Sequence, residues 1–86
     1  MNDEERKRKR IKRVARLNKP IYEKLDVVDE HFDMCEDTVN FLHAQSGQAE
    51  TQEECLALAL RSQYEIRSME QLNRLRRRLI AAITQA

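Results

Sequence analysis

The apolar positions in the first half of the chain follow a heptad spacing. Apolar residues recur at alternating intervals of four and three, at Ile21, Leu25, Val28, Phe32, Cys35, Val39 and Leu42. This alternation places one apolar seam along a single side of an α-helix, as in the a and d positions of a coiled coil. The same register extends backwards through Ile11 and Val14 and puts Asn18 at an a position. The pattern predicts a long amphipathic helix.

Proline and glycine suggest where this helix begins and ends. Pro20 interrupts the seam, and proline inside a helix costs about 3 kcal/mol. We therefore expect Asn18 to cap a helix over residues 18–46, preceded by a basic arm or short helix over residues 1–17. One continuous helix kinked at Pro20 is the alternative. Gly47, the only glycine, predicts a left-handed residue at the end of the helix.

A second helix is predicted over residues 51–85, after a loop at 47–50. Thr51 and Glu54 have the spacing of a capping box, in which each side chain binds the other residue's backbone. The apolar stripe of this helix consists of Leu58, Ile66, Met69, Leu72, Leu75, Leu79, Ile80 and Ile83.

Two amphipathic helices joined by a short loop favour an all-α fold, an antiparallel hairpin over residues 18–86. A tight loop pairs residues whose numbers sum to about 96, which sets residues 74–78 beside residues 18–22. Val27, Met34 and Phe41 repeat every seven residues away from the seam. Because a two-helix hairpin buries little apolar surface, we expect these three to mediate a homodimer, a four-helix bundle. A partly covered surface stripe is the alternative.

The composition agrees with a helical protein and sets limits on its location. The 86 residues include one Gly, one Pro and no Trp, and no apolar run approaches the roughly 20 residues of a membrane span. There is no secretory signal, and two cysteines without one favour free thiols in a reducing compartment. We expect an intracellular protein, cytoplasmic or, in a eukaryote, nuclear.

Charge is sorted along the chain, although the net charge is only +1. Residues 1–24 hold ten Lys or Arg against four acids, residues 25–60 hold nine acids and no Lys or Arg, and residues 61–86 hold six Arg against two Glu. The predicted hairpin is therefore positive at its open end and negative at its loop.

The basic residues are candidates for contacts with phosphates or with an acidic protein partner. They are Arg6, Lys7, Arg8, Lys9, Arg10, Lys12, Arg13 and Arg16, with Arg74, Arg76, Arg77 and Arg78 near the other end of the chain. No aromatic residue accompanies the first cluster, so base stacking is not expected. A solvated, partly disordered arm is the alternative.

The acidic residues of the first helix form a second candidate surface, for a basic partner. They are Asp26, Asp29, Glu30, Asp33, Glu36 and Asp37, and all lie outside the seam. They fit a solvated face better than a catalytic pair, which needs a pocket. His31 and Cys35 have the spacing of two zinc ligands, but His43 and Cys55 lie too far away to complete a site. We expect no metal, cofactor or small-molecule substrate.

The chain has no Gly-rich phosphate loop and no Ser/His/Asp arrangement, so we do not expect an enzyme. The sequence favours a noncatalytic helical protein–protein interaction module, such as an adaptor, assembly subunit, small chaperone or inhibitor. A small nucleic-acid-associated regulator that binds phosphates through its basic segment is the second hypothesis.

Overall fold

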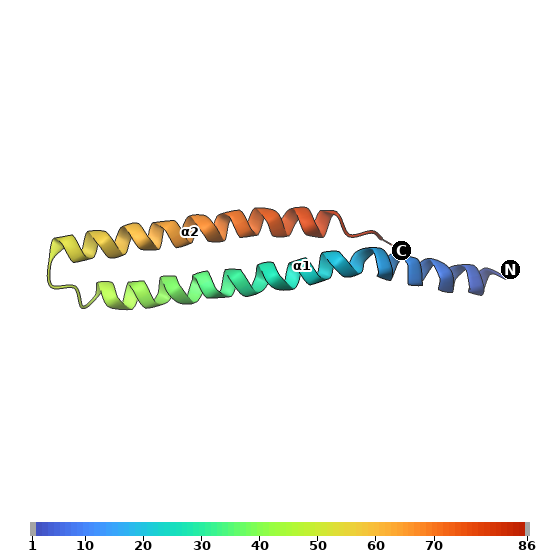
Figure 1. The fold of residues 1–86 in the computed structure, drawn as a ribbon, viewed down its shortest axis with the longest axis horizontal. Helices are drawn as coiled ribbons and strands as arrows, with labels where there is room; N and C mark the ends of the chain where they lie inside the picture. Colours follow the sequence, from blue (N-terminus) through green and yellow to red (C-terminus); the bar gives the residue numbers. More distant parts are fainter. Residues whose placement is uncertain (1, 86) are drawn as a thin grey trace.

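A computed structural model of the chain describes residues 2–85 and shows two antiparallel helices joined by a short loop (Figure 1). Helix α1 spans Asp3–Ser46, 44 residues, and helix α2 spans Gln52–Ala81, 30 residues. The molecule is a rod with extents of 74 × 16 × 13 Å. The prediction of an all-α hairpin is confirmed.

Helix α1 begins at Asp3, fifteen residues before the expected start at residue 18. Its N-cap is Asn2, whose Oδ1 accepts a hydrogen bond from the Glu5 N–H at 2.8 Å. Acidic residues in the first turn also suit the positive end of the helix dipole. An Asn followed three residues later by a Glu is a helix-start signal that was visible in the sequence.

The expected N-cap at Asn18 is wrong, because α1 continues through Pro20. Proline removes one backbone hydrogen bond, the one that an N–H at this position would donate to the carbonyl of Arg16. Asn18 and Ile21 nevertheless keep their places in the seam on either side of it, one buried and the other half-buried. The 4-3 spacing crosses the proline without a shift, so α1 is a single helix.

The expected left-handed residue at Gly47 is also wrong. Gly47 has φ −67° and ψ −15°, in the right-handed region. The last carbonyls of α1 are instead satisfied by tight turns, in which Gln48 donates to the Gln45 carbonyl at 2.9 Å and Ala49 to the Ser46 carbonyl at 3.3 Å. A positive φ is therefore not needed to end the helix.

Helix α2 begins as predicted and ends earlier. Thr51 Oγ1 accepts a hydrogen bond from the Glu54 N–H at 3.2 Å. The Glu54 carboxylate reaches the N–H of Glu50 at 3.1 Å, one residue before the partner expected for a capping box. The helix ends at Ala81 rather than at residue 85, because both backbone groups of Thr84 bond to a side chain of α1.

The core is the single seam between the helices. On α1 the predicted positions from Val14 to Leu42 are buried or half-buried, and Val28 and Leu42 are only 6% and 3% exposed, whereas Ile11 is exposed. On α2 the half-buried apolar residues are Leu58, Met69, Leu72 and Leu79, and Ile83 just after the helix is half-buried as well. The other three members of the predicted stripe, Ile66, Leu75 and Ile80, are exposed. The register of α2 instead continues through Ser62, which is buried, and Glu65, which is half-buried.

The pairing of the helices differs from the predicted register. Asn18 bonds Thr84, and Asp29 bonds Arg76, so paired residue numbers sum to 102 and 105 instead of about 96. The expected juxtaposition of residues 74–78 with residues 18–22 is therefore wrong. The residues after α2 lie beside Asn18. Arg76 lies beside Asp29, closer to the loop than predicted.

Candidate interaction surfaces

Val27, Met34 and Phe41 lie on the outside of α1, and each is more than half exposed. Their spacing of seven residues is two helical turns, so the three side chains share one face of α1. Val27 lines a groove together with Leu75 and Leu79 of α2, which places this face beside the seam and not opposite α2. Among residues 2–85, no side chain covers the three by more than about half.

Helix α2 contributes to the same side of the molecule. Val27 and Leu75 line one groove between the helices, together with Pro20, and the groove also includes the seam residues Val28 and Leu79. Leu75 is exposed although it belonged to the predicted stripe of α2. Its side chain therefore extends the apolar surface of α1 across the hairpin.

Tyr64 continues this surface toward the loop. It lies eleven residues before Leu75, about three helical turns, and so on nearly the same side of α2. The Asp29–Arg76 pairing places Tyr64 at the level of Phe41, and Tyr64 and Phe41 are both largely exposed. We call the set formed by Val27, Met34, Phe41, Tyr64 and Leu75 the apolar face. The place of Tyr64 and Leu75 on this face could not be predicted from the sequence, because it depends on the register between the helices.

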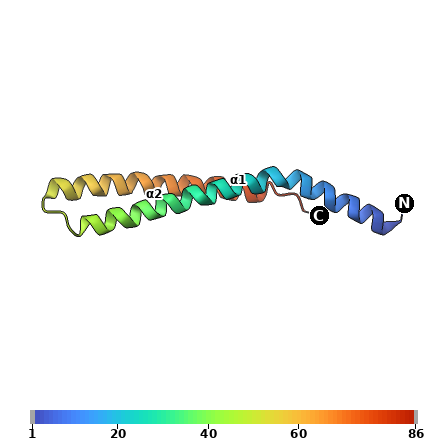
Figure 2. The same ribbon diagram turned by 60° about the horizontal axis from the view of Figure 1, so that its bottom comes forward.

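The basic residues at positions 6–16 belong to a part of α1 that extends past the end of the hairpin (Figures 1 and 2). We call residues 3–16 the N-terminal extension. All eight of its Lys and Arg side chains are exposed. Arg6, Lys9, Arg10 and Arg13 surround one shallow hollow on a single side of the helix, so four cations lie on the same side.

The second basic cluster does not join the first. Arg74, Arg76, Arg77 and Arg78 are exposed on α2, and the Nε of Arg76 bonds the Oδ1 of Asp29 at 3.0 Å. Both side chains of this ion pair are about half exposed, and exposed pairs are worth about 0–1 kcal/mol. The pair therefore orients the helices more than it stabilises them. The other predicted acidic residues are also exposed, which agrees with a solvated face: Asp26, Glu30, Asp33, Glu36 and Asp37.

Polar groups inside the seam were not predicted to interact. The Asn18 carboxamide donates to the Thr84 carbonyl and accepts from the Thr84 N–H, both at 2.8 Å. Burial and the hydrogen bond and negative charge of Glu65 raise the pKa of the Cys35 thiol. Both cysteines are free thiols. Because these partners lie far apart in the sequence, the only local signal for such a contact is a polar residue at a seam position.

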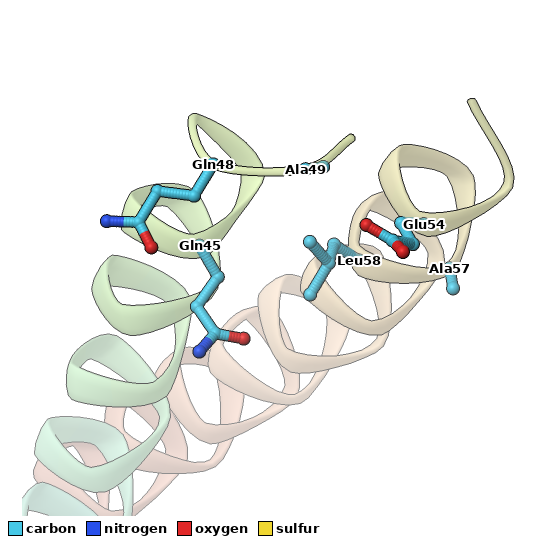
Figure 3. Close-up of a pocket in the computed structure, with 6 residues that line it drawn as sticks. All are labelled: Gln45, Gln48, Ala49, Glu54, Ala57 and Leu58. Carbon is cyan, nitrogen blue, oxygen red and sulfur yellow. The ribbon is translucent and has the colours of Figure 1, made fainter. Parts of the chain in front are cut away.

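A hollow lies at the loop end of the hairpin (Figure 3). It is lined by Gln45, Gln48, Ala49, Glu54, Ala57 and Leu58. Figure 3 shows the two glutamines on one side, at the end of α1 and the start of the loop, and Glu54 and Leu58 on the other, on α2. Two carboxamides and one carboxylate offer hydrogen bonds but no nucleophile paired with a base.

Within residues 2–85, no three His, Cys, Asp or Glu side chains gather in a way that could hold a metal ion. His31 and His43 are exposed, and Cys35 faces Glu65, so these candidates are dispersed along the rod. Neither of the helices described by the structure has the length and apolar character to cross a membrane.

Compared with protein-family models, with curated proteins and with solved structures, the chain matches none of them. The surfaces described above are therefore the basis for a functional assignment.

Proposed function

We propose that this chain is a noncatalytic helical interaction module that binds a protein through its apolar face. The observation that carries the proposal is that exposed apolar side chains of both helices gather on one side of the hairpin. Isolated exposed apolar residues are normal on soluble proteins, but contiguous patches mark interaction sites. From Val27 to Phe41 this face extends along about half the length of α2, which has 30 residues.

The shape of the hairpin supports binding rather than chemistry. Its seam leaves only Val28 and Leu42 as buried apolar residues among those described. A chain with so small a core gains stability by covering its remaining apolar surface with a partner. Adaptors and assembly subunits act in this way, and a homodimer that forms a four-helix bundle is one form that such an interaction takes.

A matched pair of substitutions tests the apolar face. Phe41→Glu adds a negative charge to the face, whereas Asn40→Glu adds the same charge at an exposed position about 100° around the helix from it. With the chain as bait in a nuclease-treated extract, we expect wild type and Asn40→Glu to retain the same proteins and Phe41→Glu to lose them. Circular dichroism should show equal helicity for all three. Equal retention by both variants would contradict the proposal.

A second candidate function, binding of nucleic acid phosphates, is favoured by the N-terminal extension. Arg6, Lys9, Arg10 and Arg13 lie on one side of a helix that projects beyond α2. If these four cations contact four phosphates of duplex DNA, log affinity should fall with log salt concentration at a slope of about 3–4, since each contact contributes about 0.9. This slope counts only the four cations of the extension, because Arg74, Arg76, Arg77 and Arg78 form a separate cluster beside Asp29.

Substitution of the four cations by glutamine tests this candidate while preserving helix propensity. The matched control is Arg74→Gln with Arg77→Gln, which removes exposed charge elsewhere. We expect the quadruple variant to lose duplex binding and its salt dependence, and the control to keep both. Absence of wild-type binding at physiological salt would exclude the second candidate and leave the first.

A further inference from the structure

The proposed function leaves open what covers the apolar face, and the charge distribution of the folded hairpin identifies one occupant. Residues 33–70, the loop half of the rod, carry eight Asp or Glu and two Arg, a net charge of −6. The remaining residues, which form the open half and the N-terminal extension, carry fourteen Lys or Arg and seven acids, a net charge of +7. The two halves are thus nearly equal and opposite in charge.

We propose that the apolar face is covered by a second copy of this chain in antiparallel orientation, with the loop half of each copy against the open half of the other. The inference rests on the proposed function, because it names the partner of the same face. A parallel arrangement would place −6 against −6 and +7 against +7. The antiparallel arrangement sets the loop half of each copy against the open half of the other, whose net charge has the opposite sign.

The apolar positions of α1 are compatible with this orientation. Pro20, Val27, Met34 and Phe41 are exposed and follow one another at intervals of seven. A two-fold axis between Glu30 and His31 places Val27 of each copy against Met34 of the other, and Pro20 against Phe41. Every apolar residue of this stripe then meets an apolar residue, as an isologous interface requires.

The exposed area is sufficient for a stable dimer. The hairpin exposes 7395 Å², whereas a compact monomer of this mass exposes about 5,300 Å². The excess of about 2,100 Å² is more than twice the roughly 800 Å² that each partner buries in a standard interface. The second copy therefore has enough surface available to bury without any change of fold.

Interchain distances between spin labels test the orientation. In a Cys35→Ala/Cys55→Ser background, a single cysteine is introduced at Arg16, Glu30 or Ala44, three exposed positions fourteen residues apart on one side of α1. For the antiparallel dimer we expect a short distance at position 30 and separations of about 40 Å along the axis at positions 16 and 44. Equal short distances at all three positions would show a parallel dimer and overturn the inference.

The mass of the wild-type protein in sedimentation, measured at different salt concentrations, tests the orientation without substitutions. The antiparallel dimer should dissociate several-fold more readily in about 0.5 M than in about 0.05 M NaCl, because salt screens attraction between opposite charges. A parallel dimer should show the reverse, since salt screens its repulsion. A wild type that stays monomeric at tens of micromolar in sedimentation also overturns the inference. The proposed function fails separately, if Phe41→Glu and Asn40→Glu retain the same proteins.

Discussion

The Asn18 side chain joins α1 to the segment after α2 at the open end of the hairpin. It is 4% exposed, and its carboxamide bonds both backbone groups of Thr84. A polar residue at an a position of a seam fixes register at some cost in stability. Its place in the seam could be predicted from the heptad spacing, but its partner could not, because 66 residues separate the two.

Asn18→Ala should lower the free energy of unfolding by about 1–3 kcal/mol, since it leaves two backbone groups of Thr84 without their partner. Urea unfolding measures the loss, and amide exchange at Thr84 should become faster. Asn40→Ala, at an exposed position of α1, is the control and should have little effect. Equal losses for the two variants would show that the bonds to Thr84 do not stabilise the hairpin.

Cys35 should make the free energy of unfolding depend on pH in the alkaline range. Burial, followed by the hydrogen bond and charge of Glu65, raises the pKa of this thiol above its ordinary value of 9.0. The fold therefore favours the neutral thiol, whose stabilising contribution is present below pH 9.0 and is lost as the pH rises through the folded-state pKa. Between neutral and alkaline pH, the midpoint temperature of thermal unfolding should fall more steeply for wild type and Cys55→Ala than for Cys35→Ala. Parallel curves for all three would contradict this expectation.

Helix α1 shows how packing along a whole element outweighs one unfavourable residue. The local cost of Pro20 predicted a helix boundary, but the seam continues with the same spacing before and after it. The cap at Asn2 and the acidic first turn also favour an early start. The two helices and most seam positions were thus predictable from periodicity. The start predicted at residue 18 is wrong although Asn2 and Glu5 carry a cap signal, because the packing of the continuous seam outweighs the local penalty of Pro20.

Pro20→Ala should restore one backbone hydrogen bond within α1 and raise the free energy of unfolding. The gain should be about 2 kcal/mol, since removal of an internal proline is worth about 3 kcal/mol in the helix and the freer unfolded chain offsets about 0.4–1 kcal/mol of it. Lys19→Ala, at the neighbouring exposed position, is the control. If chemical denaturation shows no greater gain for Pro20→Ala than for Lys19→Ala, α1 is not continuous in solution.

At the scale of the whole molecule, register determines which surfaces exist. The sorted charge and the Val27, Met34 and Phe41 repeat could be read from the sequence. The α2 side of the apolar face could not, because it depends on the pairing of Asp29 with Arg76. The separation of the two basic clusters has the same origin. A shift of six to nine in the sum of paired residue numbers moved Arg74–Arg78 away from the N-terminal extension.

The slender shape of the hairpin has a consequence for small-angle scattering. Its radius of gyration is 20.8 Å, a value that a compact chain reaches only at about 370 residues. An antiparallel dimer about a two-fold axis near His31 would be about 85 Å long, little more than the 74 Å of one hairpin. Dimerisation should therefore double the forward intensity per chain and increase the cross-sectional radius. The longest interatomic distance should rise only from 74 Å to about 85 Å.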